Sequence, residues 1–330
     1  LTGRRLRLID DELAKDPQAL AEALANRPVD CLKIVPSHLN ALMSAVNPER
    51  LLPSSCLVLG GEGLTPELVK RIASLASDCR IINHYGPTEA TVGCLAGIVK
   101  DQDAGLSGYL PLGNALPGYQ TLVLDKGLRL IPAGNEGELY ISGTSLARGY
   151  LGKPDLTAER FIPNPYGTGE FMYRTGDKVR LHQGGVVEFI GRIDQQVKIR
   201  GFRVELGEIE SWLKRQSMIK DAVVETTQRP SQSKQLLAYV VTDNVEPASL
   251  SQQMAAELPD YMVPSQFIAL EELPLLANGK VNRKGLPAPT VAPIESTTGS
   301  DAFTDHLISR QLRAIWCDVL GKEYVAPDDN

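Results

Sequence analysis

Apolar positions in the first quarter of the chain switch between the spacing of strands and that of helices. Short apolar runs at residues 31–35, 56–59 and 80–82 are typical of buried strands, and leucines at helical spacing lie between them. Thr65 and Pro66 predict the start of one such helix, as an N-cap and a first helical position. Strands and helices that alternate in this way predict a parallel sheet with right-handed crossovers, which is an α/β fold.

The pattern changes twice further along the chain. From about Leu112, short strands punctuated by glycine predict a small barrel or distorted sheet, at residues 120–124, 137–142, 178–182 and 186–190. After residue 205 the pattern predicts a compact α+β unit, with helices at 206–215 and 250–258 and strands at 222–227, 236–241 and 266–269. The remaining predictions are a strand at 4–9, a helix at 16–25, a helix from residue 36 and a last helix at 305–320.

Composition describes an ordinary soluble protein. The 330 residues are 43% hydrophobic and 22% charged, and a net charge of −6 argues against nucleic acid as a partner. No apolar run has the length of a membrane span, and no signal-peptide pattern opens the chain, so we expect no membrane partner. The cysteines lack metal-ligand spacing and predict reduced thiols in a cytoplasmic protein: Cys31, Cys56, Cys79, Cys94 and Cys317.

Loops at the ends of the predicted parallel strands are the expected ligand sites. In open α/β sheets, ligands bind beyond the carboxyl ends of the strands. Residues 60–63 and 83–89 follow two of these strands. The first loop is rich in glycine but lacks the Lys-Ser/Thr pair of a P-loop, so it does not predict that kind of phosphate site.

Residues 191–210 combine a strand pattern, a glycine and the start of a helix. Val197 and Ile199 alternate with charged neighbours as in a half-buried strand, and Gly201 interrupts the run. Charge alternation by itself fits a surface hairpin. The full string GRIDQQVKIRGFRVELGEIE, however, resembles the hinge of the adenylation domains of nonribosomal peptide synthetases, which belong to the adenylate-forming superfamily. The resemblance makes Asp194 the pivot between a larger and a smaller domain.

Further strings in the order and spacing of the same family extend the resemblance over essentially the whole chain. They are NHYGPTE at 83–89, GELYISG at 137–143, YRTGD at 173–177, LPDYMVP at 258–264 and NGKVNR at 278–283. Taken alone, the Gly-Pro pair of the first string fits an ordinary turn, and the lysine of the last string fits a solvated side chain. Lys178 stands where the family usually has leucine, and we interpret it as a surface variation.

The resemblance implies an ATP site. Asn83 and Tyr85 would contact the adenine. Asp177 would accept hydrogen bonds from the two ribose hydroxyls, a role that suits a carboxylate. Phe189 and Arg192 would flank the same nucleotide.

The resemblance also implies a reaction and its catalytic groups. Thr88 would contact the α-phosphate and Glu89 would bind Mg²⁺, for which a carboxylate oxygen is a suitable ligand. Lys280 would be the catalytic lysine and would meet the α-carboxylate of the substrate. The implied reaction joins an amino acid to AMP and releases pyrophosphate. A phosphopantetheine thiol on a carrier domain would then take the acyl group as a thioester.

The positions that select the side chain of the amino acid in this family correspond here to Lys33, Val58, Gly60, His84, Val92 and Gly93. Two are basic and none is acidic, and a buried lysine requires a counter-charge. Val58 and Val92 would leave modest width while Gly60 and Gly93 add depth, which suits a short acid. The set predicts aspartate, with asparagine as the alternative substrate. The competing interpretation is that Lys33 faces solvent and His84 packs in its loop.

The resemblance divides the chain into the C-terminal part of an adenylation core at 1–190, a mobile C-terminal subdomain at 191–286, a linker at 287–302 and the start of a peptidyl carrier domain at 303–330. The chain begins with Leu1 in mid-pattern, so we expect a piece of a larger protein. The phosphate loop and the aspartate that binds the α-amino group would lie in an upstream half of the core. The serine that bears phosphopantetheine would lie downstream. We therefore expect this chain to be inactive alone.

Two alternatives stay open. An acyl-CoA synthetase of the same superfamily would share the nucleotide strings, but such ligases normally end near the catalytic lysine, and here a carrier-like helix follows. A non-catalytic scaffold that only presents the carrier domain would need none of Glu89, Asp177 and Lys280, so their joint presence argues against it.

Overall fold

The computed structural model describes residues 3, 5–76, 79–100, 103, 108–194, 196–227, 234–242, 247–276 and 280–288. The chain divides into two compact units, residues 1–269 and residues 270–330. The predicted carrier-domain start lies outside the described residues, as does the predicted linker except for residues 287 and 288. Within the described residues, no helix is long and apolar enough to cross a membrane.

The first sheet confirms the predicted α/β layer. Its order is β1 (Cys31–Ile34), β2 (Cys56–Gly60), β3 (Arg80–Tyr85), β4 (Leu95–Ile98) and β5 (Asn114–Ala115). The first three strands are parallel, and β4 and β5 add an antiparallel edge that the sequence pattern did not predict. Strand β3 continues to Tyr85, so the first residues of the predicted ligand loop lie in the strand itself.

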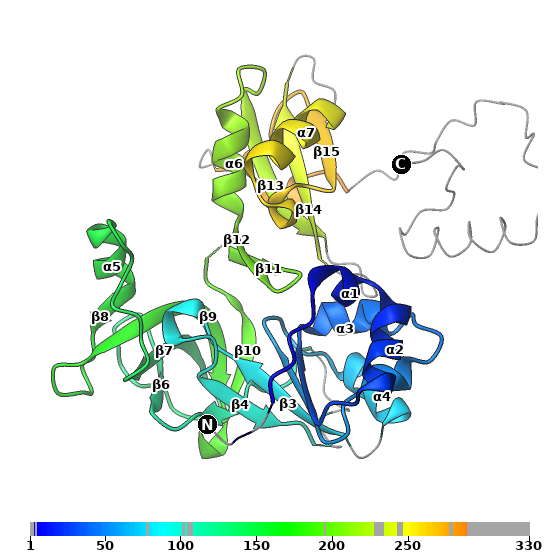
Figure 1. Cartoon of the computed structure of the whole chain (residues 1–330). Coiled ribbons are helices and arrows are strands. Elements are labelled where there is room, and N and C mark those ends of the chain that lie inside the picture. Colours follow the sequence, from blue (N-terminus) through cyan, green and yellow to red (C-terminus); the bar gives the residue numbers. More distant parts are fainter. Residues whose placement is uncertain are drawn as a thin grey trace, which may run out of the picture. The chain divides into compact units, whose positions relative to one another are not determined.

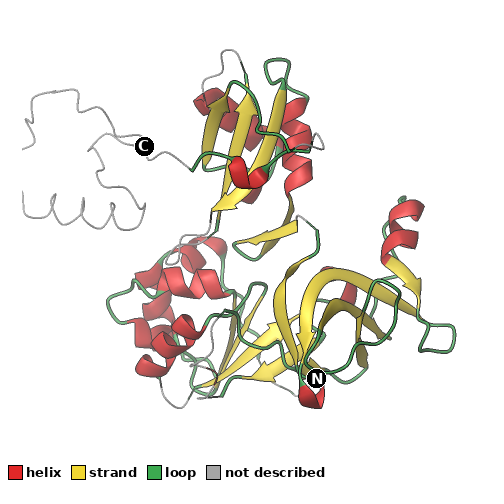
Figure 2. Ribbon diagram, turned by 180° about the vertical axis from the view of Figure 1, so that it is seen from behind, coloured by secondary structure: helices red, strands yellow, loops and turns green. Residues whose placement is uncertain are grey.

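Helices pack on one face of this sheet (Figures 1 and 2). They are α1 (Asp11–Lys15), α2 (Pro17–Asn26), α3 (Pro36–Leu42) and α4 (Pro66–Leu75). The Thr65 hydroxyl accepts a hydrogen bond from the Leu68 N–H at 3.4 Å, which confirms the predicted N-cap of α4. Leu57 and Leu59 of β2 are fully buried in the cluster that includes residues of α3 and α4. The opposite face of the strands is the one on which we expect ligands, and we call it the ligand face.

The predicted strand at residues 4–9 is wrong. Residues 5–9 form no strand, because no strand among the described residues pairs with them. The Arg7 guanidinium instead donates to the carbonyls of Ala23 and Arg27, at 3.2 and 3.0 Å, and so holds this segment against the end of α2.

The second sheet is antiparallel and has the order β10-β9-β7-β6, with β8 paired to β9. Its strands are β6 (Tyr119–Leu124), β7 (Glu136–Gly143), β8 (Phe161–Pro163), β9 (Phe171–Leu181) and β10 (Val187–Arg192). Helix α5 (Pro154–Arg160) precedes β8 and was not predicted from the sequence. Strand β9 is longer than predicted and carries the YRTGD string in its middle.

A hairpin and a small α+β layer follow. The hairpin joins β11 (Gln196–Ile199) to β12 (Phe202–Glu205), and β12 was not predicted. Then come α6 (Leu206–Lys214) and the three-stranded sheet β13-β14-β15, at Asp221–Thr227, Gln235–Val241 and Gln266–Leu270, with α7 (Pro247–Glu257). Short 3-10 turns occur at Pro48–Leu51, Thr88–Ala90, Gln183–Gly185, Asp260–Met262 and Arg283–Gly285.

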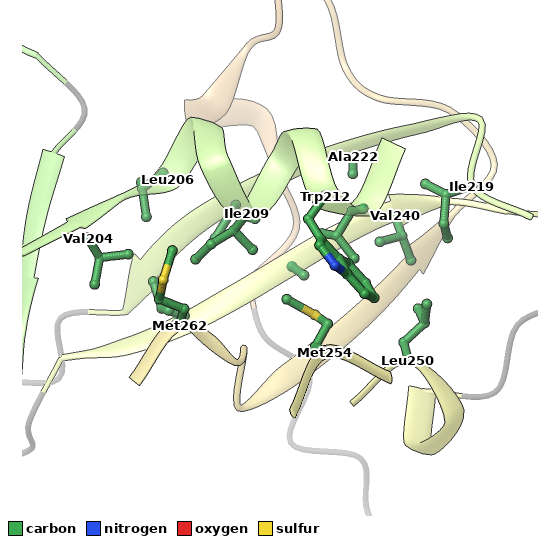
Figure 3. Packing of buried hydrophobic residues seen from close by; sticks show 14 of the residues in the cluster. Val204, Leu206, Ile209, Trp212, Ile219, Ala222, Val240, Leu250, Met254 and Met262 are labelled. Atoms are coloured by element: carbon green, nitrogen blue, oxygen red, sulfur yellow. The ribbon is translucent and has the colours of Figure 1, made fainter. Parts of the chain in front are cut away.

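The core of this α+β layer is built around Trp212 of α6 (Figure 3). Its ring is 1% exposed and packs in one cluster with Met254 of α7 and Val240 of β14. The indole N–H donates to the Glu257 carboxylate at 2.8 Å, so the one polar atom of the ring is satisfied. Ile199 and Val204 of the hairpin belong to the same cluster, which ties the apolar face of the hairpin to this layer.

We predict that Trp212→Ala will lower the free energy of unfolding by about 3–5 kcal/mol, because it removes a buried ring and leaves a cavity. Urea titration of the full-length protein followed by circular dichroism measures this change. Met218→Ala is the matched control, because Met218 is 48% exposed. A loss no greater than that of the control would contradict the central role of Trp212.

Candidate active site

The end of β3 meets β9 and β10 through a buried carboxylate. The Tyr85 hydroxyl donates to Oδ2 of Asp177, although the two residues are 92 positions apart in the chain. Nη1 of Arg192 donates to Oδ1 of Asp177 at 2.8 Å. Burial raises the pKa of Tyr85, and the charge of Asp177 raises it further, so the phenol stays protonated and can donate. The structure thus brings together three residues that the sequence predicts to bind the nucleotide.

Arg192 also binds the predicted pivot residue. Its Nε and Nη2 donate to the two oxygens of Asp194 at 2.8 and 2.6 Å, so one guanidinium bridges Asp177 and Asp194. Burial would lower the pKa of Arg192, but Asp194 and Asp177 raise it above its usual range. Gly176 packs under this bridge: a Cβ there would lie 2.8 Å from Oδ2 of Asp194. The pivot role of Asp194 stays a prediction.

Glu89 is a second buried carboxylate. Like Asp177, it accepts hydrogen bonds from one arginine and one tyrosine. It lies in the 3-10 turn Thr88–Ala90, and Nη1 of Arg203 donates to its two oxygens at 2.9 and 2.8 Å. The Tyr150 hydroxyl donates to Oε1 at 2.5 Å. Burial would raise the pKa of Glu89, but the hydrogen bond from Tyr150 and the charge of Arg203 lower it below its usual value. Glu89 is therefore ionised.

The donor set at Glu89 does not fit a magnesium ion in this arrangement. Mg²⁺ requires oxygen ligands at about 2.0–2.1 Å in octahedral geometry and is usually bound through one or two carboxylates and substrate phosphates. Both oxygens of Glu89 face the Arg203 guanidinium instead. Among the residues that the structure describes, no group of three or more His, Cys, Asp or Glu side chains could hold a metal ion. The magnesium role of Glu89 stays a prediction.

The remaining predicted nucleotide residues differ in their surroundings. The Asn83 side chain is buried, and its amide donates to the carbonyls of Leu110 and Pro111 at 3.2 and 2.8 Å. Thr88 is exposed at the start of the turn. Phe189 is half-buried, with its ring centroid 5.9 Å from that of Tyr109, which the sequence reasoning missed. The adenine and phosphate roles of Asn83, Thr88 and Phe189 stay predictions.

The polar face of the β11–β12 hairpin turns toward this site. Lys198 and Arg203 are direct cross-strand partners, so their side chains share one face. Nζ of Lys198 lies 5.4 Å from the centre of the Tyr85 ring. Burial lowers the pKa of Lys198, and the nearby Arg192 and Arg203 charges lower it further against the opposite effect of Asp177. Sequence reasoning missed both residues, although the period-two alternation with Val197 and Ile199 could have placed Lys198 on the polar face.

The tip of the hairpin is held by Glu62. The Gly201 N–H donates to Oε1 of Glu62 at 2.6 Å, and the Ser37 N–H donates to Oε2 at 3.1 Å. Gly201 has φ of 82°, and a Cβ on it would lie 2.9 Å from Val35. Glycine is therefore required at this tip for both its backbone conformation and its close packing.

Four of the residues predicted to select the substrate lie on one face of the first sheet: Lys33, Val58, Gly60 and His84. Register pairs Lys33 with Val58 and Gly60 with His84, so these side chains point away from the helices. Lys33 is exposed, and burial together with the Lys33 charge lowers the pKa of His84. The histidine is thus held in its neutral form beside a cation.

Two glycines enclose the His84 ring. A Cβ on Gly93 would lie 2.0 Å from Nε2, and one on Gly60 would lie 3.2 Å from Nδ1. The His84 ring therefore occupies the space beside Gly60 and Gly93 that we expected to be open to the substrate. Val92, next to Gly93, is exposed and has φ of 69°. Such a backbone is rare for a β-branched residue.

Lys280 lies in the second unit. Its carbonyl accepts a hydrogen bond from the Leu276 N–H at 2.7 Å, and its side chain is exposed. The catalytic role of Lys280 stays a prediction.

Comparison with known proteins finds one enzyme family in two segments. The model of the AMP-binding enzymes matches residues 1–151, and that of the AMP-binding enzyme C-terminal domain matches residues 208–280. The chain is 42% identical over 332 residues to a dimodular nonribosomal peptide synthase of Bacillus subtilis (strain 168). It is 39% identical over 333 residues to tyrocidine synthase 3 of Brevibacillus parabrevis. Both alignments cover 100% of this chain but only 14% and 5% of the relatives.

A solved structure shows the same fold. The holo form of PA1221, a nonribosomal peptide synthetase protein that contains adenylation and PCP domains, was determined with a vinylsulfonamide inhibitor. It matches with a TM-score of 0.76 and 30% identity, over 94% of this chain and 51% of that one.

We predict that Gly93→Ala will displace the His84 ring, because the added methyl group would occupy the position of the imidazole. A displaced ring loses part of the burial that depresses its pKa, so the pKa of His84 should rise toward its usual value. Histidine-selective NMR titration of the full-length protein measures this rise. Gly207→Ala is the control, since no atom lies within 4 Å of its Cβ position. An unchanged His84 pKa in a folded Gly93→Ala protein would refute the steric argument.

Proposed function

The chain belongs to the family of AMP-binding enzymes, and from this membership we propose that it activates an amino acid with ATP as part of an adenylation domain of a nonribosomal peptide synthetase. The single observation that carries the proposal is the buried junction of Tyr85, Asp177 and Arg192. It joins two strings that the resemblance assigns to one nucleotide but that lie far apart in the chain. A structural role alone would not require both strings to have the family pattern.

In the proposed first half-reaction, a carboxylate oxygen of the amino acid attacks the α-phosphorus of ATP. The bond to the bridging oxygen breaks, pyrophosphate leaves with the electron pair, and an aminoacyl-adenylate forms. Negative charge on the phosphate oxygens calls for hydrogen-bond donors and cations. The exposed Thr88 hydroxyl supplies a donor, and the ammonium of Lys198 lies 5.4 Å from the centre of the Tyr85 ring. The proposal assigns Lys280 to the substrate carboxylate, as the resemblance implies; Mg²⁺ would bind Glu89 only in an arrangement in which Arg203 does not occupy both of its oxygens.

In the proposed second half-reaction, the phosphopantetheine thiolate of a carrier domain attacks the acyl carbonyl. A thioester forms and AMP leaves. The relative PA1221 contains adenylation and PCP domains, which supports a carrier domain as the partner. An acyl-CoA synthetase is the weaker candidate, because the relatives that match the whole chain are peptide synthetases.

We propose aspartate as the amino acid, with asparagine as the alternative. Lys33 lies close enough to His84 to lower its pKa, so a cation and a neutral imidazole lie near each other on the ligand face. A side-chain carboxylate could pair with the lysine and accept a hydrogen bond from the imidazole. The competing role of the exposed Lys33 is that of a solvated side chain, and a substrate test distinguishes the two.

We predict that the complete adenylation domain exchanges pyrophosphate with ATP most rapidly in the presence of aspartate. Lys33→Met should reduce aspartate-dependent exchange by about tenfold or more, because a charge-assisted hydrogen bond contributes about 1.5–3 kcal/mol. Lys70→Met is the matched control, since Lys70 is an exposed lysine on α4. A preference for an apolar amino acid, or an aspartate preference that survives Lys33→Met, would overturn the assignment.

We also propose Asp194 as the hinge between the two half-reactions. A hinge residue must adopt two backbone conformations, and proline restricts φ to one. Asp194→Pro in the complete enzyme should therefore spare either adenylate formation or thioester formation but not both, as measured by pyrophosphate exchange and by loading of the carrier domain. Undiminished rates of both half-reactions would exclude a hinge at this position.

A further inference from the structure

Two cysteine thiols meet at the amino end of the first sheet. Cys31 begins β1 and Cys56 begins β2, and the register of these parallel strands places them side by side. We propose that Cys31 and Cys56 form a redox-sensitive pair, which hydrogen peroxide oxidises to a disulfide and a small thiol reduces again. This inference goes beyond the proposed function and does not depend on it, because the pair lies at the end of the sheet opposite to the predicted ligand loops.

The geometry of the sheet suits a disulfide at this position. Strand alternation places both side chains on the ligand face, since the next residue of each strand, Leu32 or Leu57, packs in the cluster with α3 and α4. Neighbouring strands lie about 4.7–4.9 Å apart, which is within the Cα–Cα range of about 4.4–6.8 Å found in disulfides. The Cys56 thiol already donates a hydrogen bond to the sulfur of Cys31. The pair therefore has the spacing and the direction that a disulfide requires.

The two thiols differ in access. Cys31 is exposed, so a solute reaches it directly, whereas Cys56 is half-buried. Burial, the charge of Cys31 and the hydrogen bond between them raise the pKa of Cys56 above its usual value. Arg80 of β3 pairs with Cys56 on the same rung of the sheet, and its charge opposes this rise, because a cation favours the thiolate. Cys31 is therefore the thiol that reacts first, and Cys56 is the one that closes the disulfide.

The reaction balances with hydrogen peroxide as the co-reactant. The Cys31 thiolate attacks one peroxide oxygen, the O–O bond breaks, and hydroxide leaves with the electron pair and takes up the thiol proton as water. Cys31 is then a sulfenic acid. The Cys56 thiolate attacks the sulfur of this acid, the S–O bond breaks, and hydroxide leaves and takes up the Cys56 proton as a second water. Both thiols are thereby oxidised, and the peroxide is reduced to water.

The other described cysteines lie elsewhere. Cys79 precedes β3 and packs against the cluster on the helix side of the sheet, so strand alternation separates it from Cys56. Cys94 is fully buried in a different cluster. Within the described residues, Cys31 and Cys56 are therefore the cysteines that share one face of the sheet.

Oxidation would link two strands that carry predicted substrate residues. The disulfide closes a loop over residues 31–56, which contains α3 and the 3-10 turn Pro48–Leu51. It fixes the spacing of β1 and β2 at the rung that lies two residues before Lys33 and Val58 in the same ladder. The redox state of the pair thus sets how firmly these two strands are joined.

The first experiment treats the full-length protein with hydrogen peroxide, blocks the remaining thiols and digests the protein with trypsin without reduction. Trypsin cuts after lysine and arginine and therefore places the five cysteines on five different peptides. Mass spectrometry should find the peptide that ends at Lys33 cross-linked to the peptide of residues 51–70. Dithiothreitol should then restore both thiols. A link that involves any other cysteine, or irreversible oxidation without a link, would overturn the pairing.

The second experiment separates the roles of the thiols under the same treatment. Cys56→Ser should halt the reaction at the sulfenic acid of Cys31, which dimedone labels. Cys31→Ser should leave Cys56 largely unreacted over the same time, because burial keeps it a protonated thiol. Cys79→Ser is the matched control, a half-buried cysteine on the other face of the sheet, and should form the disulfide as the wild type does. Loss of the disulfide in Cys79→Ser, or undiminished oxidation of Cys56 in Cys31→Ser, would contradict the proposal.

Discussion

Burial of two carboxylates is the constraint on which the candidate site depends. Asp177 is 4% exposed and Glu89 is 7% exposed, and an unpaired buried carboxylate would cost several kcal/mol. Each is neutralised in the same way, by one arginine and one tyrosine hydroxyl: Arg192 and Tyr85 for Asp177, Arg203 and Tyr150 for Glu89. These pairs join β3 to β9 and β10, and the turn after β3 to the hairpin and to the loop before α5. The same interactions therefore neutralise the buried carboxylates and connect the segments of the site.

The tyrosines matter because their hydroxyls can only donate while they are protonated. Burial and the adjacent carboxylates raise the pKa of Tyr85 and of Tyr150, so neither ionises near neutral pH. The two arginines are offset by the carboxylates with which they pair, and Lys198 lies 5.4 Å from the centre of the Tyr85 ring with its pKa lowered by burial.

The residues that we predict to select the substrate are positioned mainly by steric fit, and not by ion pairs. Strand alternation separates the buried leucines of β2 from Val58 and Gly60, and the absence of side chains at Gly60 and Gly93 makes room for the His84 ring. A neutral histidine held in this way can act as a donor of fixed direction. Lys33, in contrast, is exposed and positioned by its strand alone. The two basic residues therefore differ in how firmly the fold fixes them.

The sequence by itself determined the alternation of strands and helices in the parallel layer, the N-cap at Thr65 and the α+β layer after residue 205, because local periodicity and capping chemistry specify them. It also determined the family, because several strings occur in the family's order, and it singled out Glu89, Asp177 and Arg192. Only the tertiary structure decided their partners. Arg203, Tyr150 and Lys198 lie in other segments, and no local pattern indicates which carboxylate a distant arginine will neutralise. The strand expected at residues 4–9 failed for a related reason: an apolar alternation becomes a strand only where another strand is present to pair with it.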